Sequence, residues 1–242
     1  MNHHDRINIL WSLTLIATVA LLFMGRIPQD PSYHRFADNA TLLGIQNFWN
    51  VFSNLPFLLV GMWGLRRDVQ IEYKRDYQIL CVGILLVSLG SAYYHYSPST
   101  PTLLWDRLPM TVAFMALFSM LLKERVLNTE LPLTNILVVL GIASAVYWYW
   151  TETKGMGDLR AYALVQFLPM LLIPAMLYLF DSRYLNSKYL VMALIYYVGA
   201  KFFEQFDTQV FSIGHFLSGH TIKHLLASIA SFYIIVAVPK CD

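Results

Sequence analysis

Eight long apolar stretches, each close to the length of a membrane-spanning helix, dominate this chain of 242 residues. A helix needs about 20 predominantly apolar residues to cross the hydrocarbon core of a bilayer. Hydrophobic residues make up 57% of the chain and charged residues 13%, which excludes an ordinary soluble globular domain. The sequence therefore predicts an all-α fold, a polytopic membrane helical bundle. The expected spans are residues 7–24, 48–65, 78–97, 103–122, 132–150, 159–180, 188–206 and 220–238.

The distribution of basic residues predicts how the bundle is inserted. Lys and Arg concentrate on cytoplasmic loops, and many more of them fall on the side that holds both termini. We therefore expect both termini in the cytoplasm. The net charge of +2 gives no indication of a nucleic-acid partner. The side with the termini holds Arg6, Arg66, Arg67, Lys74, Arg75, Lys123, Arg125, Arg183, Lys188 and Lys240, and the other side holds Arg26, Arg35, Lys154 and Arg160.

No internal repeat or flexible linker interrupts the alternation of apolar stretches and short loops, so we expect one transmembrane domain over residues 1–242. Within it, residues 1–24 form an extra N-terminal helix, which we expect to be retained because its apolar run is long for a cleaved signal sequence. Residues 25–47 form a loop on the non-cytoplasmic side, and residues 48–238 form a seven-helix core.

Five polar side chains near the ends of spans are predicted to meet in one leaflet. Ser91 and His95 close the third span, Asp106 opens the fourth, and His220 and His224 open the eighth. Ionisable residues inside a membrane usually mark function. The spacing of four residues places His220 and His224 on one face of a helix, as it does Ser91 and His95. These span ends share one face of the membrane, which is the non-cytoplasmic face under the charge distribution above.

Three neutral imidazoles and one open position are the usual arrangement of a catalytic zinc site. We therefore expect His95, His220 and His224 to bind Zn²⁺, which lowers the pKa of a bound water toward about 7. Asp106 is the candidate to orient that water and accept its proton. Ser91 has two possible roles, either donating a hydrogen bond to a developing oxyanion or holding the ring of His95 in its tautomer.

Other charged residues near this leaflet have simpler explanations. Lys201 and Glu204 are three residues apart on one span and are expected to form an ion pair. Asp207 follows them and would support a ligand histidine as a hydrogen-bond acceptor. Arg107 is expected to reach the headgroup region or to pair with a carboxylate. His215 falls in a loop, off the face of His220, and is left out of the predicted site.

Four segments together resemble the motifs of the alkaline ceramidases, a family of membrane hydrolases related to the adiponectin-receptor-like proteins. The resemblance runs from about Asp38 to the C-terminus, and the chain looks most similar to prokaryotic members. It implies a seven-helix bundle with an intramembrane zinc, in which His95, His220 and His224 are ligands, Asp106 lies beside the zinc-bound water and Ser91 lies near the oxyanion. The segments are Phe48–Asn54, Gly90–His95, Trp105–Pro109 and Gly219–Ala227.

The implied reaction is hydrolysis of the amide of ceramide, or of a related N-acyl lipid, to a sphingoid base and a fatty acid. A lipid substrate suits this composition because a long-chain amide reaches the site from the bilayer. The eukaryotic members also have a calcium site with a glutamate just before Phe-Trp-Asn, but this chain has Asn47 there and only Asp38 as a weak substitute. The alternative is a receptor-like or transport protein with a structural metal. The sequence leaves chain-length preference and oligomeric state open.

Overall fold

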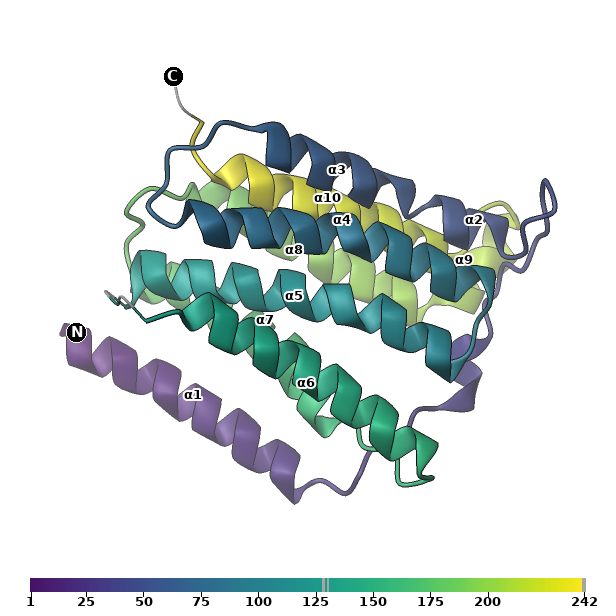
Figure 1. Ribbon diagram of the computed structural model, residues 1–242, viewed down its shortest axis with the longest axis horizontal. Coiled ribbons are helices and arrows are strands. Elements are labelled where there is room, and N and C mark those ends of the chain that lie inside the picture. The colour runs from purple at the N-terminus through teal and green to yellow at the C-terminus, as the bar shows by residue number, and fades with distance from the viewer. Residues whose placement is uncertain (128, 130, 241–242) are drawn as a thin grey trace.

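The computed structural model describes residues 1–127, 129 and 131–240, and they form an all-α bundle (Figure 1), as the sequence predicts. Isolated bridges join Leu42 to Ile45 and Val69 to Lys240. The elements are α1 (His3–Phe23), the 3-10 turn η1 (Pro31–His34), α2 (Phe48–Phe52), α3 (Leu55–Arg66), α4 (Lys74–Tyr96), α5 (Thr100–Arg125), α6 (Leu133–Thr153), α7 (Arg160–Leu179), α8 (Ser187–Gln205), α9 (Asp207–Gly214) and α10 (Gly219–Ala237).

Within the described residues, seven helical segments are long and apolar enough to cross a membrane, with α2 and α3 counted as one segment, Phe48–Arg66. They correspond to seven of the eight expected spans and support a multi-pass membrane protein. The exception is α8, which carries Lys188, Lys201 and Glu204. It nevertheless lies in the bundle and packs along α10 (Figure 1).

The N-terminal helix α1 lies at the edge of the bundle, where it packs against α7 (Figure 1). Leu10 is its buried residue, whereas Trp11 and Phe23 are exposed. The Arg6 guanidinium donates a hydrogen bond of 2.7 Å to the Leu179 carbonyl at the end of α7. The helix therefore presents mostly apolar side chains outward, as a helix in contact with lipid would.

The second expected span, residues 48–65, is two helices rather than one, because the backbone ladder is interrupted at Ser53 and Asn54. The Ser53 hydroxyl and the Asn54 amide both donate to the Asn50 carbonyl, at 3.2 and 2.8 Å. Pro56 has no backbone N–H to continue the ladder. Such side-chain bonds compete with helical backbone bonds, and the break frees the Ser53 side chain to face the interior.

A short turn joins α4 to α5 and sets how the two helices meet. Ser99 and Thr102 form a reciprocal capping box at the start of α5. Gly90 lets α4 approach α5 closely, since a Cβ there would collide with the Trp105 carbonyl. The last turn of α4 and the first turns of α5 are thereby held side by side.

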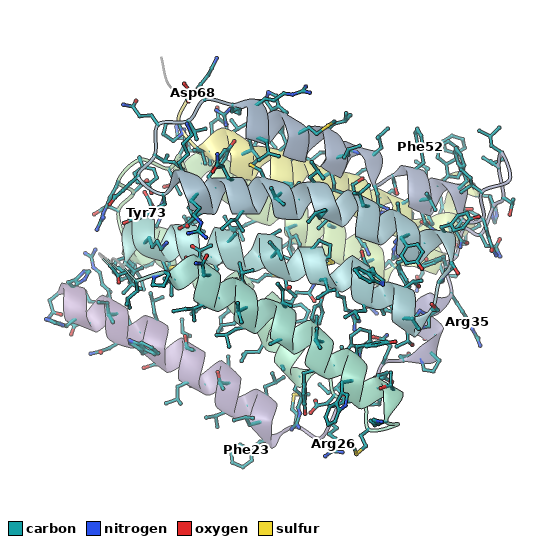
Figure 2. The ribbon with its side chains drawn as sticks, viewed as in Figure 1. Phe23, Arg26, Arg35, Phe52, Asp68 and Tyr73 are labelled. Atoms are coloured by element: carbon teal, nitrogen blue, oxygen red, sulfur yellow. The ribbon has the colours of Figure 1, made fainter. Side chains whose placement is uncertain are left out.

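The bundle has two distinct ends, which can be located by residues labelled in Figure 2. Asp68 and Tyr73 lie at one end, and Phe52 and Arg35 lie at the other. We call the second the loop-25–47 end, because residues 25–47 cover it. The last turn of α4 and the first turn of α10 both lie there, since α4 runs away from Tyr73 and α10 runs antiparallel to α4 and parallel to α3 (Figure 1).

Candidate metal centre

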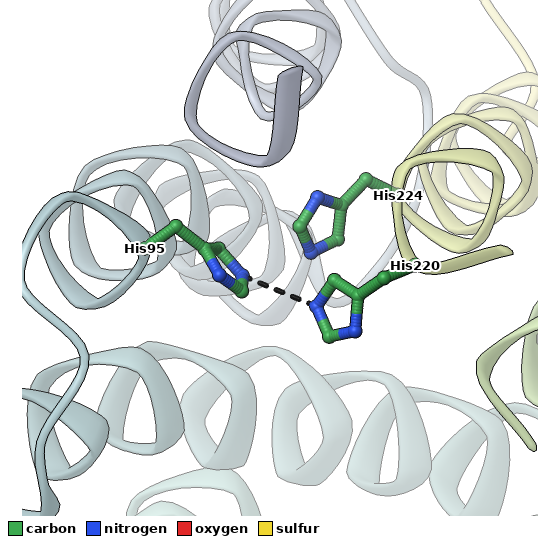
Figure 3. A group of neighbouring side chains, drawn as sticks. All are labelled: His95, His220 and His224. Carbon is green, nitrogen blue, oxygen red and sulfur yellow. Dashed lines mark hydrogen bonds between the residues drawn. The ribbon is translucent and has the colours of Figure 1, made fainter. Parts of the chain in front are cut away.

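Three buried histidines meet at the loop-25–47 end. His95 comes from the last turn of α4, and His220 and His224 come from successive turns of α10 (Figure 3). Their ring centroids are 4.8 Å apart for His95 and His220, 4.8 Å for His95 and His224, and 4.9 Å for His220 and His224. The structure thus brings together side chains that are 125 residues apart in the chain.

The nitrogen atoms of this triad fit a divalent metal ion. One nitrogen from each ring can be chosen so that all three lie within 4.8 Å of one another. The Nε2 atoms of His95 and His220 are 3.3 Å apart, close to the separation of about 3.3 Å that tetrahedral zinc imposes on two nitrogens at its bond length. The Nε2 atom of His224 is buried without a hydrogen-bond partner among the described residues. Buried polar atoms are rarely left unpaired, so the donor set suits a bound metal.

Ser53 fixes the ring of His224. Its hydroxyl oxygen lies 2.8 Å from Nδ1 of His224, and both side chains are buried. A histidine that bonds through one ring nitrogen leaves the other free for a metal, and here the free atom is Nε2. No role for Ser53 was predicted from the sequence. Its position inside the Phe48–Asn54 motif was the available signal, but the break in the helix that turns it inward was not visible.

Asp207 lies next to His220 but does not contact its ring. One carboxylate oxygen accepts the backbone N–H of His220 at 2.7 Å, and the other accepts the N–H of Ala37 at 3.0 Å. The prediction that Asp207 supports a ligand histidine as a hydrogen-bond acceptor is therefore confirmed, but through the backbone N–H of His220 and not through its ring. The carboxylate thereby ties the first turn of α10 to the covering loop.

Asp106 and Ser91 lie on facing helices and line the same cavity as His224. Both side chains are buried. Nδ1 of His95 has no hydrogen-bond partner within the described part of the chain. Of the two roles considered for Ser91, holding the His95 ring is therefore not the one that the structure has.

The cavity, with a volume of about 190 Å³, runs from these polar residues into the apolar interior. Asp106 and Leu121 both line it and are fifteen residues apart on α5, so it extends about 22 Å along that helix. Its walls away from the histidines are almost entirely hydrocarbon. Residues toward its far end include Leu80, Leu117, Leu121, Ile173, Leu190 and Ile234.

The expected ion pair between Lys201 and Glu204 is confirmed, at 2.7 Å. Lys223, which the sequence analysis passed over, binds the same glutamate at 3.0 Å. Its Nζ also lies 3.2 Å from Nε2 of His220. The Lys223 ammonium thus lies beside the same ring nitrogen that faces His95. A lysine inside an apolar stretch, one turn from His220, was the signal that could have revealed it.

Arg107 is buried rather than extended to the headgroup region, and it forms no salt bridge among the residues the structure describes. Both expectations for it are therefore wrong. Its guanidinium donates to the Gln29 amide oxygen at 2.7 Å. The guanidinium carbon lies 4.0 Å from the ring centroid of Trp148 and 4.7 Å from that of Tyr162. Aromatic rings hold this cation where a carboxylate was expected.

Two residues considered for a calcium site have bonds within the loop-25–47 end. The Asn47 amide donates to the His95 carbonyl at 2.9 Å, which ties the last turn of α4 to the start of α2. Asp38 is buried, and its carboxylate accepts the backbone N–H of Ala40 at 3.0 Å. Asn47 thus has a structural contact to the backbone of a candidate ligand.

Comparison with known proteins gives one positive result. A protein-family model described as Ceramidase matches residues 41–242. A search of curated proteins finds no match. The matched region contains all three histidines, Ser91 and Asp106, and it leaves α1 outside.

Proposed function

The chain belongs to the ceramidase family, and we propose that it is a zinc-dependent intramembrane amidase that hydrolyses ceramide or a related N-acyl lipid to a sphingoid base and a fatty acid. His95, His220 and His224 are the proposed ligands, with Asp106 and Ser91 as the catalytic residues. The N-terminal helix α1 is an addition to the core of residues 48–238, within one transmembrane domain.

The observation that carries the proposal is that the triad adjoins the polar end of a long apolar cavity, which His224 lines. Three imidazole nitrogens within 4.8 Å of one another suit a metal. The adjoining cavity, with its hydrocarbon walls, suits an acyl chain. A site that joins these two features places a reacting amide at the boundary between them.

When bound, zinc would polarise the amide carbonyl and supply hydroxide at neutral pH. The Asp106 carboxylate, buried on the cavity wall, would accept a proton from the attacking water and then deliver it to the leaving nitrogen. The Ser91 hydroxyl would donate to the carbonyl oxygen as negative charge develops there. The C–N bond breaks, and water supplies the hydroxyl of the acid and a hydrogen of the amine.

The substrate would enter from the bilayer with its acyl chain along the cavity. Leu117 and Ile173 are among the residues that would contact the chain and exclude water from it. With both termini in the cytoplasm, as the basic residues predict, the histidines would lie toward the non-cytoplasmic leaflet. Zinc at three histidines is part of this proposal, and calcium is not.

The test is hydrolysis by the purified protein in lipid nanodiscs. Ceramides and other N-acyl lipids would be supplied as a mixture and the products identified by mass spectrometry, with metal content measured on the same sample. We expect close to one zinc per chain, loss of activity on chelation and recovery on adding zinc. Asp106→Asn should abolish turnover but keep the metal, whereas the exposed Asp68→Asn should change neither.

A protein that binds zinc but releases no fatty acid from any N-acyl lipid in the mixture would contradict the proposal. That result would favour the receptor-like or transport alternative, in which the metal is structural. Full turnover by Asp106→Asn would contradict the role of that carboxylate alone.

A further inference from the structure

The polar end of the cavity is lined by three basic side chains and two acidic ones, and of the basic side chains Arg107 is buried while Lys201 and Lys223 are partly exposed. Arg107, Lys201 and Lys223 line it, together with the acidic residues Asp106 and Glu204. The three histidines add no negative charge. A neutral amide substrate needs none of these cations.

Arg107 is the least neutralised of the three. It is 6% exposed, and its Nη1 atom has no hydrogen-bond partner among the residues that the structure describes. Among the described residues, the side chain to which it donates a hydrogen bond is the neutral Gln29. A guanidinium offers five donors in a planar fork that matches a carboxylate or phosphate. The Nη1 donors of Arg107 are therefore available to a ligand in the cavity.

The two lysines share one acid. Glu204 accepts from Lys201 at 2.7 Å and from Lys223 at 3.0 Å, so a single negative charge serves two ammonium groups. Tyr33, whose ring lies 5.8 Å from the guanidinium carbon of Arg107, directs its hydroxyl to the same glutamate at 3.5 Å. The cations thus surround one region of the cavity and are linked through common neighbours.

We propose that the polar end of the cavity is an anion site, which binds the acidic group of a long-chain amphiphile through Arg107 with support from Lys201 and Lys223. The anion has two possible sources: the carboxylate of the released fatty acid, or an acidic headgroup on the N-acyl substrate. The inference extends the proposed amidase function by assigning the charge of its ligand. Binding does not itself depend on hydrolysis.

The experiment measures binding of three probes that cannot be hydrolysed, by isothermal titration calorimetry in a nonionic detergent. Palmitate places its carboxylate at the position that the carboxylate of a released fatty acid would occupy. Hexadecyloxyacetate places its carboxylate beyond the position of the amide, where an acidic headgroup would lie. Hexadecanol is the uncharged probe. For any one probe, partitioning into micelles is the same whichever protein is present. The ratio of wild-type to variant affinity for that probe is therefore independent of partitioning. Arg107→Gln is the test variant, and Arg66→Gln, exposed at the opposite end, is its matched control.

We expect Arg107→Gln to weaken at least one acidic probe about 10-fold or more, as loss of charge-assisted hydrogen bonds does, and to leave hexadecanol within about 2-fold. Arg66→Gln should leave the affinity for all three probes unchanged. Loss confined to palmitate would identify the released acid as the anion, and loss confined to hexadecyloxyacetate would identify an acidic headgroup. Loss of both would show that the site accepts either.

Equal changes for charged and uncharged probes, or none, would overturn the proposal. If Arg107→Gln does not fold, Lys201→Gln takes its place, with a smaller selective loss of the acidic probes expected and with exposed Lys188→Gln as its control. Hydrolysis without anion selectivity would refute this inference alone. Anion selectivity in a protein that hydrolyses nothing would refute the amidase function alone.

Discussion

Both ends of the bundle carry ion pairs, but among the described residues the pairs whose two side chains are both less than a tenth exposed lie at the end opposite the histidines. There, Lys123 binds Asp76 at 2.7 Å, and Glu124 binds Arg125 at 3.0 Å. A single oxygen of Glu124 also accepts hydrogen bonds from the turn after α7, including one of 2.7 Å from the N–H of Arg183. These charges hold helix ends and a loop in place.

At the loop-25–47 end, buried polar groups remain without partners. The described residues provide none for Nδ1 of His95, Nε2 of His224 or Nη1 of Arg107. Leaving a buried group unpaired costs about 1 to 3 kcal/mol, and more for a charge. The contrast teaches that one end uses its polar groups to stabilise the fold, while the other keeps them for ligands.

The largest effect that would test this contrast comes from removing a histidine. His95→Ala should leave the helical content unchanged and reduce bound metal from about one per chain to nearly none. Hydrolysis should fall by well over ~100-fold, because loss of a residue that only supports a metal ligand already lowers metal affinity or activity by up to about that factor. His215→Ala is the control, because that side chain is exposed. Metal analysis and circular dichroism check the result, and an intact metal content in His95→Ala would refute the ligand assignment.

The next largest effect is expected at the opposite end, on stability. Glu124→Ala would leave the buried Arg125 without its counter-charge and strip the turn after α7 of its acceptor. Breaking a buried pair in this way costs about 3–5 kcal/mol. Unfolding in mixed micelles measures the loss, with the exposed Glu72→Ala as control. The folded fraction should keep its metal, and selective loss of metal would break the distinction between the two ends.

Ser53→Ala tests whether a polar group at the histidine end serves metal binding and not stability. Without the hydroxyl at Nδ1, the His224 ring loses the contact that directs Nε2 inward. Support of this kind is worth about 10–100-fold in metal affinity, with little change in unfolding free energy. Competition with a chelator measures the affinity. Ser144→Ala, which is equally buried but lies on α6, should leave it unchanged.

The smallest expected effect concerns Asp158, in the loop between α6 and α7. Hydrogen bonds from the Arg160 side chain hold the pKa of Asp158 below its ordinary value of 3.8. A lowered pKa stabilises the fold above that ordinary value, and the contribution is lost as the pH falls through the lowered pKa. Asp158→Asn should therefore cost about 1 kcal/mol near pH 7, and the gap from wild type should close in acid. Thermal unfolding at several pH values checks this, and a gap that widens in acid would contradict it.

Most of the fold could be predicted because long apolar stretches leave the backbone few alternatives to helices in a membrane. The boundaries were less accurate. The third expected span begins at residue 78, whereas α4 begins at Lys74, because a helix continues through polar residues after the apolar stretch has ended. The break at Ser53 was missed because side-chain bonds to a local carbonyl leave no mark in hydropathy.

Residue type and spacing predicted which side chains gather at the site, but not the contacts that each of them makes. His220 and His224 share a helix face by spacing alone, and the order of the spans places His95 at the same end. Spacing does not indicate which neighbours reach a ring, so Ser53 and Lys223 were missed, and it does not indicate that Asp207 supports His220 through the backbone N–H. Arg107 was placed wrongly because its aromatic partners come from α6 and α7, distant in sequence.

The sequence by itself determined that this chain is a helical membrane bundle with chemistry concentrated at one end, since hydropathy and helical periodicity act along the chain. Only the tertiary structure decided which buried groups are satisfied and which are left open. That depends on contacts between helices that no local pattern specifies, and those contacts separate the paired charges of one end from the unpaired nitrogens of the other.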